Sequence, residues 1–285
     1  MSDERPIGFF DSGVGGLTVL REVLRRLPAE STIYLGDNAR APYGPRSDEE
    51  VRRFSSECLD ELAARDVKAI VVACNTASAI ALTELRQRYD VPILGVVRPG
   101  ASAAVLSTRS RHVGVIATAA TVRSRAYFGA IKDEDPFVEV YEHATPELVP
   151  MVEAGVLDGP EAEDVVRRSL APLLEPRHDV EDAVFPRPPG AGIDTLLLGC
   201  THYPLLTPLI SGVAGPGVAV IDSASATASA LASLLEVNGL GARRDAPPRH
   251  VQFTTGDVAV FRRTTERLFG SLFPAVEPVA LVGVA

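Results

Sequence analysis

Two cysteines in this sequence stand where a short apolar run gives way to polar residues. In VVACNTAS (residues 71–78) the run leads into Cys74, and in TLLLGCTHYP (residues 195–204) it leads into Cys200. A cysteine at the carboxyl end of a strand, directly before a helix, lies where free backbone amides and the helix dipole favour a thiolate. One such cysteine is typical of a covalent nucleophile. Two of them on opposing lobes indicate proton transfer at opposite faces of one carbon atom.

The residues that directly follow the cysteines can bind an anion and assist proton transfer. Asn75, Thr76 and Thr201 are neutral hydrogen-bond donors that suit a carboxylate at the start of a helix. His202, two residues after Cys200, can assist that cysteine as an acid or a base.

Polar residues upstream complete a site for an amino dicarboxylate. Asp11 can hold an ammonium group and assist one cysteine, while Ser12 and the amides of Tyr43 and Gly44 can receive a second carboxylate. An α-carbon inverts when one thiolate removes its proton and a thiol on the other face delivers another. In principle this chemistry needs neither a metal nor an organic electron sink, provided that hydrogen bonds and charge stabilise the carbanion.

Each of these residues also has a plain structural role open to it. Cys74 and Cys200 can be buried thiols, and Asp11 can cap the helix that follows it. His202 can be a satisfied core histidine, and Tyr43-Gly44 can be turn chemistry between two prolines.

The elements that must position these residues alternate between strands and helices. Ile7–Phe10 is an apolar run, DSGVGG follows it, and Leu17–Leu27 has helical spacing. The glycines lack the GxGxxG spacing of dinucleotide-binding loops. Further strands are expected at 31–35, 68–73 and 91–97, and further helices at 47–65 and 77–89. This alternation predicts a parallel sheet that binds ligands beyond the carboxyl ends of its strands.

A second unit repeats the plan of the first. VGVIATA resembles IGFFDSG in layout, LLLGCTH resembles IVVACNT, and a helical stretch follows at 122–131. We therefore expect an α/β protein of two pseudo-symmetric lobes, each with a mainly parallel sheet flanked by helices, and the active site in the cleft between them. The first lobe is expected to comprise residues 1–98 and 210–285 and the second residues 99–209, with a surface insertion at 177–192.

Composition narrows the function further. The chain has 285 residues and a net charge of −9, which argues against nucleic acid as the main partner. The start MSDERP lacks the features of a secretory segment, and no apolar run approaches the length of a membrane span, so we expect no membrane partner and a cytoplasmic location. Three cysteines without CxxC spacing give neither a disulfide framework nor a metal site.

Four motifs, in order, resemble one enzyme family. FDSGVGGLTVL, YLGDNARAPYGPRS, ACNTAS and LLGCTHYPLL are similar to motifs of bacterial glutamate racemases, within the aspartate/glutamate racemase superfamily. The resemblance covers nearly the whole chain. It implies a cofactor-independent enzyme that interconverts L- and D-glutamate and supplies D-glutamate for peptidoglycan. A homodimer is also implied.

The resemblance assigns roles to individual residues. It makes Cys74 the base for D-glutamate and Cys200 the base for L-glutamate, with Asp11 and His202 as auxiliary acid-base residues. PELVPMVEAG resembles a further family segment and adds Glu153 as the third such residue, for which the alternative is an ordinary surface glutamate. The implied substrate-binding positions are Asp11, Ser12, Tyr43, Gly44, Asn75, Thr76, Thr201 and His202, together with Thr118 and Thr121.

Two features depart from the family pattern. GVVRPGA has Arg98 where many members have glutamate, and the stretch 177–192 is longer than expected. The alternatives that remain are a racemase for aspartate or another acidic amino acid, a regulatory protein that binds glutamate without exchanging its α-proton, and a cysteine hydrolase, which would leave one thiol without a role.

Overall fold

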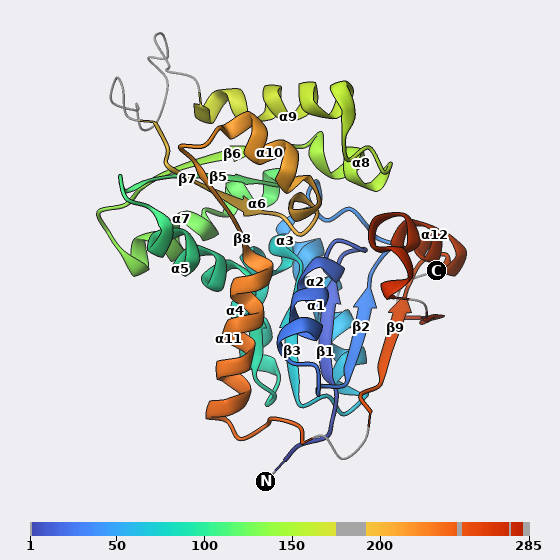
Figure 1. Cartoon of the computed structure of the whole chain (residues 1–285). Helices are drawn as coiled ribbons and strands as arrows, with labels where there is room; N and C mark the ends of the chain where they lie inside the picture. Colours follow the sequence, from blue (N-terminus) through green and yellow to red (C-terminus); the bar gives the residue numbers. More distant parts are fainter. Residues whose placement is uncertain (1, 175–191, 244–246, 274, 282–285) are drawn as a thin grey trace.

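The strands of the protein form two parallel sheets that lie side by side (Figure 1). The computed structural model describes residues 2–174, 192–243, 247–273 and 275–281. The expected surface insertion at 177–192 lies, apart from its last residue, outside these residues. The α/β fold of two helix-flanked parallel sheets is confirmed.

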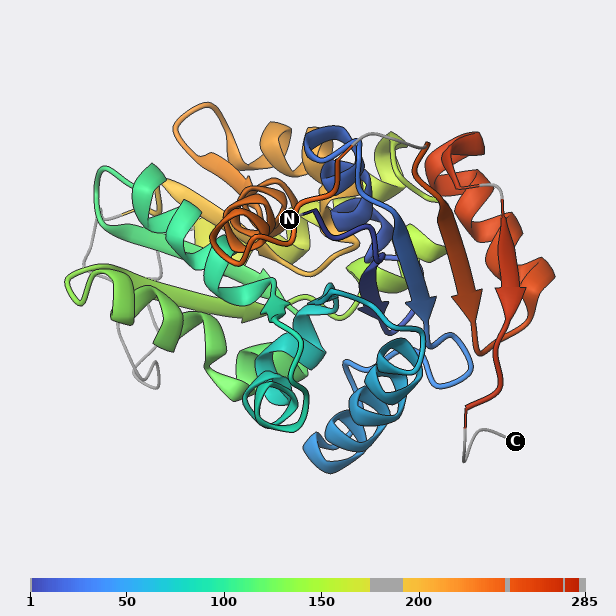
Figure 2. The ribbon, with the colours of Figure 1, turned by 90° about the horizontal axis from the view of Figure 1, so that it is seen from below.

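The first sheet has six strands in the order β10-β9-β2-β1-β3-β4. Its central strand β1, with the sequence IGFFD, is buried along its whole length, because helices cover both faces of a parallel sheet (Figure 2). The strands are β1 Ile7–Asp11, β2 Thr32–Gly36, β3 Ala69–Val72, β4 Ile93–Gly95, β9 His250–Thr254 and β10 Val276–Pro278.

The second sheet repeats the inner part of the first. Its order is β6-β5-β7-β8, which matches β2-β1-β3-β4 strand for strand. The strands are β5 His112–Ala117, β6 Glu139–Ala144, β7 Thr195–Gly199 and β8 Ala219–Asp222. Because β3 and β7 are equivalent in this plan, Cys74 and Cys200 follow equivalent strands of the two sheets.

The helices start where the sequence provides caps. Ser47 and Glu50 form the expected capping box at the start of α2, and Cys74, Thr118 and Asp222 cap later helices with their side chains. The helices are α1 Leu17–Arg26, α2 Asp48–Ala63, α3 Asn75–Ile80, α4 Leu82–Arg88, α5 Val97–Ser107, α6 Ala119–Ser124, α7 Ala126–Glu134, α8 Leu148–Glu153, α9 Gly159–Leu174, α10 Thr207–Ala214, α11 Ser223–Val237 and α12 Val258–Phe269. Two 3-10 turns, η1 Tyr203–Leu206 and η2 Gly270–Leu272, follow β7 and α12.

Two helices expected to be continuous are broken. The stretch 77–89 divides at Ala81, whose φ of −106° departs from helical geometry. The stretch 122–131 divides at Arg125, whose left-handed φ of 56° ends α6 and begins α7. The strand expected at 91–97 is shorter, because α5 already begins at Val97.

The tail of the chain differs from the expected lobe division in one respect. Residues 210–285 were all expected in the first lobe, but β8 pairs in parallel with β7 and so belongs to the second sheet. The chain returns only through α11, which packs against α1 and α5 (Figure 1). After α11, β9 and β10 join the first sheet as expected.

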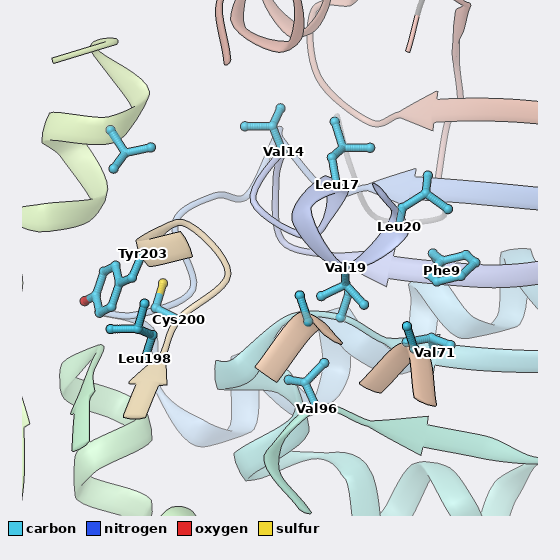
Figure 3. Packing of buried hydrophobic residues seen from close by; sticks show 14 of the residues in the cluster. Phe9, Val14, Leu17, Val19, Leu20, Val71, Val96, Leu198, Cys200 and Tyr203 are labelled. Atoms are coloured by element: carbon cyan, nitrogen blue, oxygen red, sulfur yellow. The ribbon is translucent and has the colours of Figure 1, made fainter. Parts of the chain in front are cut away.

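One buried cluster runs from the first sheet into the second unit. It contains Phe9 and Val71 of the first sheet together with Leu198, Cys200 and Tyr203 around the end of β7 (Figure 3). The loop that carries Cys200 is therefore held by the core on one side. Among the described residues, no helix combines the length and the hydropathy needed to span a membrane.

Candidate active site

A cavity of about 440 Å³ lies where the two units meet. Loops after β1, β2 and β3 of the first sheet and after β5, β6 and β7 of the second contribute its walls. Of the residues expected in the site, the cavity is lined by Ser12, Tyr43, Gly44, Cys74, Asn75, Thr76, Thr118, Glu153, Cys200, Thr201 and His202. Asp11 and Thr121 are fully buried and are not part of the lining.

Cys74 is a buried thiol at the N-terminus of α3. Its Sγ accepts a hydrogen bond from the amide of Ala77 at 3.4 Å and donates one to Ser12 Oγ at 3.5 Å. Burial, reinforced by the Asp11 carboxylate, raises the pKa of this thiol from 9.0 to about 12. Cys74 is therefore protonated at neutral pH, and its thiol can act as a general acid.

Cys200 has a different partner. Its Sγ lies 3.9 Å from His202 Nδ1, and His202 Nε2 lies 3.2 Å from Glu153 Oε1. Burial by itself would lower the pKa of His202, but the hydrogen bonds and charges of Cys200 and Glu153 outweigh it and raise that pKa from 6.5 to about 10. A cationic imidazolium beside a sulfur atom favours a thiolate. The two cysteines thus have different surroundings, because Cys200 lies beside His202 whereas Cys74 caps α3.

The state of His202 gives a direct test of this arrangement. We expect the imidazole to stay protonated through neutral pH and to titrate near pH 10, because its charged form has the two partners. Histidine NMR signals recorded against pH, with His202→Gln used for assignment, measure the midpoint. Glu153→Gln should shift the midpoint downward, since it removes one of these partners. A wild-type midpoint near the ordinary value of 6.5 would contradict the assignment.

Asp11 lies at the end of β1, behind the cavity wall. Its Oδ2 accepts a hydrogen bond from the amide of Gly13 at 2.9 Å, whereas its buried Oδ1 has no partner among the described residues. Burial raises the pKa of this carboxyl, and the charge of His202 acts in the opposite direction. A buried carboxylate oxygen without a partner is costly. Such an atom is suited to accept a hydrogen bond from an ammonium group.

Threonines from both units meet at the adjoining wall. Thr76 Oγ1 lies 3.0 Å from Thr118 Oγ1 and 3.5 Å from Thr121 Oγ1, and the Thr118 and Thr121 hydroxyls are 3.0 Å apart. Thr76 is in the first turn of α3, and Thr118 caps α6. Two helix N-termini with hydroxyl donors therefore converge here, which is an arrangement that suits a carboxylate.

Asn75 connects the units behind the same wall. Its Nδ2 donates to Tyr127 Oη on α7 at 2.6 Å, so its amide group is fixed in orientation. Its Oδ1 is buried without a hydrogen-bond partner among the described residues. The Asn75 side chain therefore joins the start of α3 to α7.

The glycine loop after β1 serves packing between the units. A Cβ atom at Gly15 would lie 2.4 Å from Thr201 Oγ1 and 2.5 Å from His202 Nδ1. Thr18, on the following helix, donates a hydrogen bond to the carbonyl of Thr201 at 3.0 Å. The loop therefore brings the backbone of the first unit directly against the Cys200 loop.

Several cavity residues were missed by sequence reasoning. The cavity also has an apolar wall that includes Pro42, Val149 and Pro150, and it is lined by Thr145, whose Oγ1 lies 2.6 Å from Tyr203 Oη. The signal available for α8 was the PELVPMVEAG segment, but only its glutamate carries recognisable chemistry.

Arg98 does not reach the cavity. It forms an exposed ion pair with Asp133, with 3.0 Å between Nη2 and Oδ2, on the surface between α5 and α7. Within the described ranges, no group of three or more His, Cys, Asp and Glu side chains is placed to hold a metal ion.

The fold agrees with a comparison to known proteins. The chain belongs to the Asp/Glu/Hydantoin racemase family, whose model matches residues 7–231. It is therefore a racemase, which is an isomerase.

Particular relatives narrow the resemblance to glutamate racemases. The chain is 46% identical over 266 residues to the glutamate racemase of Oceanobacillus iheyensis, covering 93% of this chain and 92% of the relative. The crystal structure of glutamate racemase isoform RacE1 from Bacillus anthracis superposes with a TM-score of 0.88 at 41% identity, covering 98% of each chain. That of the Francisella tularensis glutamate racemase in complex with D-glutamate gives 0.85 at 34% identity, again covering 98% of each. The resemblance stated from the motifs is confirmed.

Proposed function

We propose that this protein interconverts L- and D-glutamate by proton transfer between the α-carbon and two cysteines. The observation that carries the proposal is the placement of Cys74 and Cys200 on one cavity, after equivalent strands of two similar sheets. The glutamate racemase relatives, one of them solved with D-glutamate, support glutamate as the substrate.

The starting enantiomer determines which cysteine acts as the base, and for L-glutamate it is Cys200. The Cys200 thiolate, beside the His202 imidazolium, takes the α-proton and becomes a thiol. The Cys74 thiol gives its proton to the other face of the same carbon and becomes a thiolate, so no net proton is consumed. For D-glutamate the same steps run in reverse. Two groups that exchange roles in this way satisfy general acid and base catalysis in both directions.

The remaining side chains hold the substrate during these steps. Thr76, Thr118 and Thr201 can donate to the α-carboxylate, whose oxygens carry developing negative charge when the proton leaves. We assign the ammonium group to the side where Asn75 lines the cavity and Asp11 lies directly behind the wall, since both carry a buried oxygen without a partner among the described residues. Ser12 and the Tyr43-Gly44 turn line the cavity, and we assign the second carboxylate to them. We infer that the D-glutamate formed supplies peptidoglycan synthesis.

A substrate comparison tests the proposal. The purified protein is incubated with L-glutamate or L-aspartate, with chelator and without added cofactor, and the products are separated by chiral chromatography. We expect D-glutamate from L-glutamate and far slower turnover of aspartate. Preferential turnover of aspartate would replace the proposed substrate. Binding of glutamate without any turnover would favour a regulatory protein instead.

A further inference from the structure

We propose that Asp37 and Arg40 form a buried anchor that holds the Tyr43-Gly44 turn in place as the receptor for the second substrate carboxylate. This inference rests on the proposed function, because the second carboxylate is that of the glutamate substrate. Asp37 and Arg40 themselves lie outside the cavity lining. Asp37 and Arg40 are positioning residues, since they act through Tyr43 rather than on the substrate.

Asp37 gathers hydrogen bonds from three separate side chains. It directly follows β2, and its side chain is fully buried. Its Oδ2 accepts from Tyr43 Oη at 2.5 Å and from Arg40 Nε at 2.7 Å, while its Oδ1 accepts from Thr255 Oγ1 at 2.7 Å. Its own amide donates to the carbonyl of Asp11 at 2.9 Å. Asp37 thus connects the ends of β1, β2 and β9 to the turn, with its amide on β1 and its carboxylate on Thr255 and Tyr43.

Arg40 balances the buried charge. Beyond Asp37, its guanidinium pairs with Glu57 of α2, lies 3.7 Å from Cys58 Sγ, and stacks 4.2 Å above the Phe54 ring. Isolated charges are expensive to bury, and removing one partner leaves the other uncompensated. A loop that only connects two elements does not need a buried network of charges at its base. A fully paired network of this kind makes the loop rigid, and here the loop is the cavity-lining turn at Tyr43-Gly44.

The turn presents its backbone to the cavity and its side chain to the anchor. Ala41 through Pro45 line the cavity, yet the Tyr43 ring is only 1% exposed and packs between Phe10 and Phe54. Among the described residues, none accepts a hydrogen bond from the amides of Tyr43 or Gly44. These amides are therefore free to bind a carboxylate. The hydrogen bond from Tyr43 Oη to Asp37 keeps the turn that carries them in position.

The placement leads to a specific kinetic signature. A carboxylate remote from the reacting carbon is held equally in the ground state and in the transition state, so weakening its receptor raises KM and leaves kcat almost unchanged. We expect Tyr43→Phe to raise KM for both enantiomers about tenfold, because the turn loses its hydrogen bond to a charged acceptor. Asp37→Asn should raise KM at least as much.

Thr255→Val is the matched control. It removes a hydrogen bond of similar length to the same carboxylate, together with the bond that Thr255 Oγ1 accepts from the Ala39 amide at 3.1 Å, but it leaves the bond to Tyr43 intact. Its thermal unfolding temperature should fall about as much as that of Tyr43→Phe, while its KM stays within about twofold of wild type. This pairing separates positioning from a general loss of stability, even if Asp37→Asn does not fold.

The outcomes distinguish the anchor from the proposed function itself. A wild-type protein that fails to racemise glutamate refutes the proposed function before any variant is compared. With an active wild type, equal KM for Tyr43→Phe, Thr255→Val and wild type overturns the anchor. So does a Tyr43→Phe protein that loses kcat at unchanged KM.

Discussion

Replacing either Cys74 or Cys200 by serine should lower kcat for glutamate racemisation about 10³-fold in both directions, which is the scale of a lost acid or base. Serine keeps the size and the hydrogen-bonding capacity of the thiol, but an alcohol is a far weaker acid. Each direction needs one cysteine to take a proton and the other to give one, so neither direction survives the loss of either. Circular dichroism of the reaction mixture follows the rate from each enantiomer.

The double variant and the third cysteine complete this experiment. Because the pair acts as a unit, Cys74→Ser combined with Cys200→Ser should be little worse than either single variant. Cys58 is buried on α2 away from the cavity, so Cys58→Ala should keep kcat within about threefold. A Cys200→Ser enzyme with full activity in both directions would refute the two-base assignment.

The second large effect is expected for Gly15→Ala, with a fall in kcat of at least about 100-fold. The added methyl group would lie 2.4 Å from Thr201 Oγ1 and 2.6 Å from His202 Cε1. Neither unit can yield cheaply there, because His202 is held by Glu153 and the Thr201 carbonyl by Thr18. The displaced His202 would no longer support Cys200, and kcat is the parameter that reports it.

Gly212→Ala is the control for the general effect of adding a methyl group to a glycine. Gly212 lies in α10, where the added methyl group would have no described atom outside its own helix turn within 4 Å, and alanine favours a helix. This variant should retain wild-type kcat and unfold at an equal or higher temperature. Wild-type kcat in Gly15→Ala would show that the contact between the glycine loop and His202 is unimportant for catalysis.

Much of the fold could be predicted because its signals are local. Buried apolar runs such as IGFF mark strands, and the Ser47 capping box marks the start of α2. The equivalence of the two units was visible in the layout of their motifs. The position of β8 was not, because strand pairing between residues 195–199 and 219–222 leaves no mark in either segment alone.

The candidate site was predictable where the type of a residue by itself indicates the chemistry it can perform. Cys74, Cys200 and His202 stand at strand ends, and the structure brings them to one cavity. No role for Asp37 or Arg40 could be predicted, since their burial depends on contacts with Tyr43, Glu57 and Thr255. Glycine is likewise required at position 15 because of close contacts with Thr201 and His202, nearly two hundred positions away, which the local sequence does not reveal.

The most direct test of the central claim is the isotope pattern during racemisation of L-glutamate in heavy water. In a two-base reaction the proton removed by Cys200 is not the one delivered by Cys74, which exchanges with solvent. We predict that D-glutamate formed at early times carries deuterium at the α-carbon, while the remaining L-glutamate is still largely protonated there. D-glutamate that retains the original α-proton, or an α-proton signal that never changes, would contradict the account.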